Sequence, residues 1–159
     1  MRSFALLAAA AAMAALALRG PAAAQDFCGG LRTLERSAER DFSDVIDTQR
    51  NRLGSPRGRR VLPDALTAEI QTAQGRDRVR TVSYIATFGG WSGIGRPNGS
   101  LVDRVRGCYP AAQPTSEARA GGGPTTWFQI GARTRIGVEE TTQGQEYLAY
   151  VIVERRSGG

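Results

Sequence analysis

Two cysteines, Cys28 and Cys108, constrain the fold of this chain more than any other residues. A bond between them would tie the start of the folded part to a point far along the chain. Such bonds form and persist in oxidising compartments, where an even number of cysteines indicates pairing. Whether this bond forms therefore depends on where the protein is located, and the N-terminus indicates that location.

The first 24 residues have the three parts of a secretory signal peptide. Arg2 gives a positive start, residues 4–18 form an unbroken apolar run, and residues 22–24 are alanines that a signal peptidase accepts. As a helix, this run would span about 22 Å at about 1.5 Å per residue, short of a hydrocarbon core about 30 Å thick. We therefore expect cleavage between Ala24 and Gln25, a periplasmic or secreted protein, and no transmembrane span in the mature form.

The mature chain is then long enough for one domain, which we predict over residues 25–156, followed by a disordered tail at residues 157–159. Cys28 and Cys108 are predicted to form a structural disulfide in this domain. A redox or metal-binding pair is the alternative, but the sequence contains no C-x-x-C motif. The bridge would remove chain entropy from the unfolded state.

The chain contains no histidine and no lysine. Catalytic relays that use histidine, histidine-based zinc sites, Schiff bases and the phosphate-binding lysine of a P-loop are therefore excluded. We expect no enzymatic activity, no cofactor and no metal site. The alternative is a hydrolase that depends on carboxylates, but the acidic residues Asp41, Asp44 and Asp47 follow a predicted helix surface beside arginines, as ordinary exposed charges do.

Apolar residues recur every three or four positions from Cys28 to Arg52, which predicts a long amphipathic helix. A shorter helix is predicted from Ser100, which forms a capping pair with Asp103, to Cys108. Alternating apolar and polar residues predict a strand over residues 79–88. Further strands are predicted over residues 126–132, 133–140 and 146–155.

Two other segments are less regular. Residues 61–66 fit either a short strand or one helical turn, and residues 111–125 have the composition of a surface linker. The order of elements predicts an α+β fold of two layers, with a long N-terminal helix and a short second helix packed on an antiparallel sheet of four to five strands. The disulfide would hold the two helices together on that sheet.

Three short motifs carry a resemblance to known proteins. Cys28-Gly29-Gly30-Leu31 opens the first helix, Leu62-Pro63-Asp64-Ala65 follows it, and Arg106-Gly107-Cys108-Tyr109-Pro110 ends the second helix. In this layout the chain resembles small exported, uncharacterised proteobacterial proteins whose α+β outline is similar to that of type III secretion chaperones. The resemblance implies neither an enzymatic activity nor a particular ligand.

We expect a non-catalytic binding module that contacts a protein partner in the cell envelope. The alternative is a binder of anionic envelope components, either lipid headgroups or polyanionic polymers. The export signal and the lack of interleaved aromatic residues argue against nucleic acid. Solvated arginines and a flexible glycine-rich loop at residues 89–99 would be the simpler explanation of the same residues. The candidate residues for binding an anion or a partner are Arg57, Arg59, Arg60, Arg76, Arg78, Arg80, Trp91 and Arg96.

Overall fold

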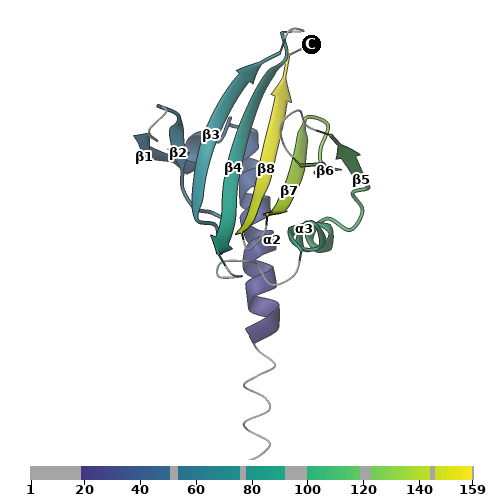
Figure 1. Ribbon diagram of the computed structural model, residues 1–159. Coiled ribbons are helices and arrows are strands. Elements are labelled where there is room, and N and C mark those ends of the chain that lie inside the picture. Colours follow the sequence, from purple (N-terminus) through teal and green to yellow (C-terminus); the bar gives the residue numbers. More distant parts are fainter. Residues whose placement is uncertain are drawn as a thin grey trace, which may run out of the picture.

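The fold is dominated by one antiparallel sheet (Figure 1). The computed structural model describes residues 19–50, 54–75, 78–91, 100–118, 123–143 and 146–158. Within these residues, eight strands lie in the order β1-β2-β3-β4-β8-β7-β6-β5. Their bounds are β1 Ile46–Arg50, β2 Pro56–Gly58, β3 Thr67–Gln74, β4 Arg80–Trp91, β5 Pro114–Glu117, β6 Thr125–Gln129, β7 Thr134–Gln143 and β8 Glu146–Ser157.

The predicted fold class was wrong. Most of the described chain is antiparallel sheet, whereas we expected a long helix on a sheet of four to five strands. The described helices are α2 (Arg19–Ala38), a single 3-10 turn η1 (Ser43–Val45) and α3 (Leu101–Cys108). The strands that sequence analysis missed are short or lie near the edges of the sheet, so few of their side chains are buried and alternation is weak.

The predicted helix from Cys28 to Arg52 is also wrong at its end, since α2 stops at Ala38. Asp41 and Phe42 adopt left-handed backbone, with φ of 51° and 61°, and this turns the chain out of the helix. Phe42 is fully buried, and its ring centroid lies 6.0 Å from that of Tyr84 in β4. Apolar residues continue at helical spacing past Ala38, but Phe42 reaches the core from a turn and not from a further helical segment.

Several predicted elements are confirmed. The strand at residues 79–88 is β4, and the three C-terminal strands are β6, β7 and β8. The second helix is α3, and the Ser100 hydroxyl accepts a hydrogen bond from the Val102 amide as its N-terminal cap. Residues 61–66 form neither a strand nor a helix but a turn, with Asp64 at φ 67°. The expected linker at residues 111–125 contains β5, and β8 extends to Ser157.

The core lies between the two helices and one face of the sheet, with α2 behind the sheet in Figure 1. The predicted disulfide between Cys28 and Cys108 is present and joins α2 to α3, with a Cα–Cα distance of 5.3 Å. No helix among the described residues has the length and apolarity needed to cross a membrane. The largest fully buried side chains include Phe27, Leu31, Leu34, Phe42, Tyr84, Phe88, Leu101, Phe128 and Ile136.

Asp41 ties the turn after α2 to two neighbouring strands. Its carboxylate accepts a hydrogen bond from Arg80 of β4 at 2.6 Å and from Arg155 of β8 at 2.7 Å. Burial by itself would raise the pKa of Asp41, but the hydrogen bonds and charges of the two arginines outweigh it, so the pKa is lowered. The ion pairs therefore stabilise the fold at neutral pH.

We expect Asp41→Asn to lower the free energy of unfolding by about 1 kcal/mol at pH 7. Asparagine tolerates the left-handed backbone, so the substitution removes mainly the charge. The pKa of Asp41 is lower in the folded than in the unfolded state. The difference in unfolding free energy between wild type and Asp41→Asn should therefore shrink as the pH falls below about 4. Urea unfolding across this pH range measures it, with the exposed Asp103→Asn as control. A deficit that persists at pH 2 would contradict the explanation.

Candidate binding site

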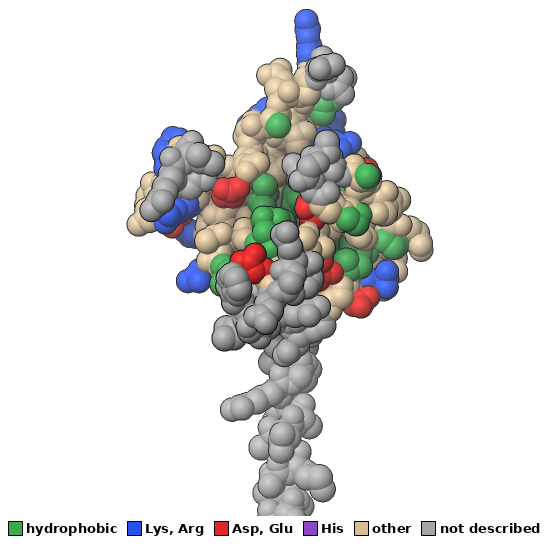
Figure 2. All heavy atoms as spheres, viewed as in Figure 1, with side chains coloured by type: hydrophobic (Ala, Val, Ile, Leu, Met, Phe, Trp, Pro, Cys, Tyr) green, Lys and Arg blue, Asp and Glu red, His purple; other side chains and the backbone are tan. Residues whose placement is uncertain are grey.

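The sheet has one covered and one uncovered face in the described part of the chain. Along β4, Val82 and Tyr84 point into the core against α2, while Ser83 and Ile85 point to the other side. We call that other side the open face, since no described element packs over it (Figure 1). Figure 2 views the molecule from this side, with hydrophobic side chains gathered near its middle and basic side chains mainly toward its margins.

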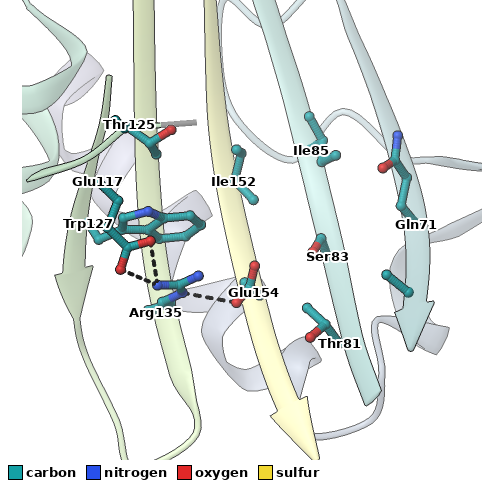
Figure 3. Close-up of a pocket in the computed structure, with 12 residues that line it drawn as sticks. Gln71, Thr81, Ser83, Ile85, Glu117, Thr125, Trp127, Arg135, Ile152 and Glu154 are labelled. Atoms are coloured by element: carbon teal, nitrogen blue, oxygen red, sulfur yellow. Dashed lines mark hydrogen bonds and ion pairs between the residues drawn. The ribbon is translucent and has the colours of Figure 1, made fainter. Parts of the chain in front are cut away.

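A groove of about 320 Å³ crosses the open face, and we call it the Trp127 groove (Figure 3). It draws side chains from six strands, β3 to β8, of which β5 is the last strand of the described sheet on this side. Its lining is mixed, with apolar side chains beside hydroxyl and amide groups. The lining residues are Gln71, Ala73, Thr81, Ser83, Ile85, Glu117, Ala118, Thr125, Trp127, Arg135, Ile152 and Glu154.

Trp127 of β6 lies flat against the sheet because its partner on β7 is a glycine. Trp127 is paired with Gly137, and a Cβ atom at Gly137 would lie only 2.6 Å from the indole ring. The Arg135 guanidinium lies on the ring at 3.6 Å from its centroid, within the range of a cation–π interaction. The indole is therefore held in place and only 7% exposed.

The charges at the Trp127 groove are paired with one another. Arg135 donates from Nε to Glu154 at 2.9 Å and from Nη1 to Glu117 at 3.1 Å. Glu154 also accepts from Nε of Arg156 at 2.8 Å. Two carboxylates thus face two guanidinium groups, and the Arg135 and Glu154 side chains are only 13% and 12% exposed. A ligand in this groove would meet paired charges, so long-range charge attraction would contribute little to its binding.

One side-chain oxygen at the groove has no hydrogen-bond partner in the described part of the chain. The hydroxyl oxygen of Thr125 is buried, and no hydrogen bond to it is found among the described residues. This oxygen is buried beneath the surface of the groove, so it is not open to a ligand there. The amide of Gln71 and the hydroxyl of Ser83 give the groove hydrogen-bonding capacity without net charge.

Glu140 of β7 does not line the Trp127 groove but stabilises the start of α3. Its carboxylate accepts hydrogen bonds from the Ser100 hydroxyl at 2.9 Å, the Leu101 amide at 3.0 Å and the Tyr147 hydroxyl at 2.9 Å. A carboxylate in this place satisfies the first amide of α3 and complements the helix dipole. Across the described ranges, no group of three or more acidic, cysteine or histidine side chains is placed to bind a metal ion.

The predicted site residues are spread over three places. Arg57, Arg59 and Arg60 come together at a second hollow beside β2 and β3. Arg78, with φ 63°, and Arg80 lie at the far end of β4, where Arg80 is paired with Asp41. Trp91 is the last residue of β4, with its side chain outside the described part, and two further predicted residues lie outside the described ranges altogether, namely Arg76 and Arg96.

Sequence analysis did not identify the residues that build the Trp127 groove. A signal was available, since a hairpin between the predicted strands at residues 126–132 and 133–140 can place Trp127 opposite Gly137. That pairing would have predicted an indole lying flat on the sheet. The contributions of Glu117 and Glu154 depend on β5 and on the order of the strands, which the sequence pattern did not indicate.

Comparison with known proteins adds no relative. No family model matches the chain, and neither a curated protein nor a solved structure matches it. The resemblance to small exported proteobacterial proteins therefore stays a prediction, and what bears on function is the geometry of the open face.

Proposed function

We propose that this chain is an exported, non-catalytic binding module that holds an extended segment of a protein partner on the open face of its sheet. The observation that carries the proposal is the Trp127 groove, an uncovered hollow in which the charges are paired with one another. Such a lining favours apolar contact and hydrogen bonding over attraction of a charged polymer. An extended polypeptide offers both kinds of contact along its length.

The edge of the sheet supports the same kind of partner. All four residues of β5 are exposed, and in the described sheet β5 pairs only with β6. An edge strand of this kind can accept a further strand from another protein through main-chain hydrogen bonds, while side chains enter an adjoining groove. Because Glu117 of β5 lines the Trp127 groove, a strand added at this edge would run beside it.

Export is supported by two features. The disulfide between Cys28 and Cys108 is the kind of bond that persists in an oxidising compartment. The first 24 residues have the composition of a cleavable signal peptide. Cleavage between Ala24 and Gln25 would leave both cysteines in the mature protein, together with every residue that lines the groove.

The proposal is tested with two alanine-to-arginine variants. Ala73 lines the groove and is exposed, so Ala73→Arg fills the groove without disturbing the core. Ala111 is exposed and is not among the groove residues, so Ala111→Arg adds the same side chain elsewhere. We expect Ala73→Arg to weaken binding of the purified envelope partner at least about tenfold, and Ala111→Arg to leave it unchanged.

The partner is first captured with the mature wild-type protein, identified by mass spectrometry and then produced separately. Calorimetry at low and high salt measures its affinity for each variant. The paired charges of the groove predict an affinity that changes little with salt. Equal binding by wild type and Ala73→Arg, or binding that high salt abolishes, would refute the proposal.

A further inference from the structure

A second hollow, of about 340 Å³, lies beside β2 and β3, toward the edge of the described sheet opposite to β5. We call it the arginine hollow. Arg57 belongs to β2, and Arg59 and Arg60 follow directly. All three are exposed, and none of them forms an ion pair with another described residue. The hollow is lined by Asp47, Arg57, Gly58, Arg59, Arg60, Leu66, Thr67, Ala68 and Glu69.

The backbone that carries these arginines is anchored to the core. The buried hydroxyl of Tyr84 donates a hydrogen bond to the carbonyl oxygen of Arg59 at 2.6 Å and accepts one from the Val61 amide at 3.2 Å. The Arg59 amide donates to the carbonyl oxygen of Val45 at 2.7 Å. Hydrogen bonds therefore hold the chain on both sides of Arg60.

Gly58 brings this segment close to the core. A Cβ atom there would lie 2.8 Å from the Tyr84 ring, so only glycine allows the approach. Burial also raises the pKa of Tyr84 above its ordinary value. Positively charged side chains on a fixed backbone bind a ligand at a lower entropic cost than side chains on a mobile loop.

The arginine hollow also contains two carboxylates. Asp47 and Glu69 line it, so three positive charges face two negative charges. A bare anion would be attracted by the arginines and repelled by these carboxylates. A ligand that carries an oxyanion and several hydroxyl groups fits better, because the guanidinium groups bind the oxyanion and the carboxylates accept hydrogen bonds from the hydroxyls.

We infer that Arg57, Arg59 and Arg60, held in place through Tyr84, form a binding site for a phosphorylated sugar unit. This site is separate from the Trp127 groove and does not depend on the protein partner proposed above. Free sugar phosphates and the phosphorylated sugars of envelope polymers share this chemistry. The experiment distinguishes the two sources by comparing a monosaccharide with a polymer.

The first experiment titrates the mature protein with glucose 6-phosphate, inorganic phosphate and glucose. We expect glucose 6-phosphate to bind measurably tighter than inorganic phosphate, and glucose not to bind. A polysaccharide whose sugars carry phosphate groups, if it binds tighter per phosphate than the monosaccharide, would identify a polymer as the source, and equal binding would identify the free sugar phosphate. Equal affinity for glucose 6-phosphate and inorganic phosphate, or no binding of either, would overturn the inference.

Two variants test whether the site depends on the arginine geometry. Replacing Arg57, Arg59 and Arg60 together with lysine keeps the charge but removes the planar fork that binds two oxygens at once, so we expect at least about a tenfold loss of affinity for glucose 6-phosphate. Lysine at the exposed Arg32, Arg36 and Arg106 is the matched control and should have no effect. Equal binding by both triple variants would show that diffuse charge alone is responsible.

Tyr84→Phe tests the positioning residue. It removes the hydroxyl bound to Arg59 and Val61, and we expect weaker binding of glucose 6-phosphate with unchanged affinity of the Trp127 groove for its protein partner. Weaker binding of both glucose 6-phosphate and the protein partner would mean that Tyr84 only stabilises the fold, and would contradict its positioning role. Since the two ligands are measured separately, failure of either proposal leaves the other standing.

Discussion

Replacement of both cysteines with serine is expected to lower the free energy of unfolding by about 4–5 kcal/mol. The bond between Cys28 and Cys108 closes a loop with a sequence separation of 80 residues. In the chain-entropy description, a cross-link over so long a loop removes many conformations from the unfolded state and so favours folding.

The measurement is thermal and urea unfolding of the double serine variant against wild type under reducing and oxidising conditions. A loss of this size corresponds to a fall in melting temperature of roughly 10–20 °C for a domain of this length. Reduced wild-type protein should unfold like the variant, and oxidised wild-type protein should be more stable than both. A difference below about 1 kcal/mol would mean that packing between α2 and α3, rather than the disulfide, holds the helices together.

The second large effect is expected at the Trp127 groove. Trp127→Ala removes a nearly buried indole that lies between Gly137 and Arg135, and we expect a loss of about 3 kcal/mol in the free energy of unfolding. Arg135 would lose its cation–π contact, although its bonds to Glu117 and Glu154 would remain. Urea unfolding monitored by circular dichroism measures the difference.

Gly137→Ala provides the matched test of why the indole lies where it does. In wild type the new Cβ would approach the ring to 2.6 Å, so we expect a cost of about 1–3 kcal/mol. In the Trp127→Ala background the same substitution should cost almost nothing, because the ring is gone. A double-mutant cycle gives this coupling directly. Equal costs of Gly137→Ala in both backgrounds would show that the indole does not depend on the glycine.

The sequence indicated the central strands and the second helix but not the edges of the sheet. Strands β4 and β8 are long and place every second apolar side chain in the core, such as Val82 and Tyr84 of β4 and Tyr147 and Ala149 of β8, so their period is visible in the chain. Edge strand β5 has four exposed residues and β1 has none that are buried, so neither has an apolar period to detect. Helical spacing after Ala38 was misleading because Phe42 reaches the core from a turn.

The candidate sites were predictable to different degrees. Arg57, Arg59 and Arg60 lie within four residues of sequence, so their grouping could be predicted, although the anchoring by Tyr84 could not. The Trp127 groove combines side chains from six strands whose order in the sheet differs from their order in the chain. Its Arg135–Glu117 and Arg135–Glu154 pairs therefore depend on sheet topology that periodicity does not reveal.

Site-specific photo-crosslinking tests most directly whether the open face binds the partner. A photoreactive amino acid at Gln71 would lie in the Trp127 groove, and one at Arg36 would lie on the exposed surface of α2. With the purified partner present, we predict a crosslink from position 71 and none from position 36. A crosslink from position 36 with none from position 71 would contradict the account.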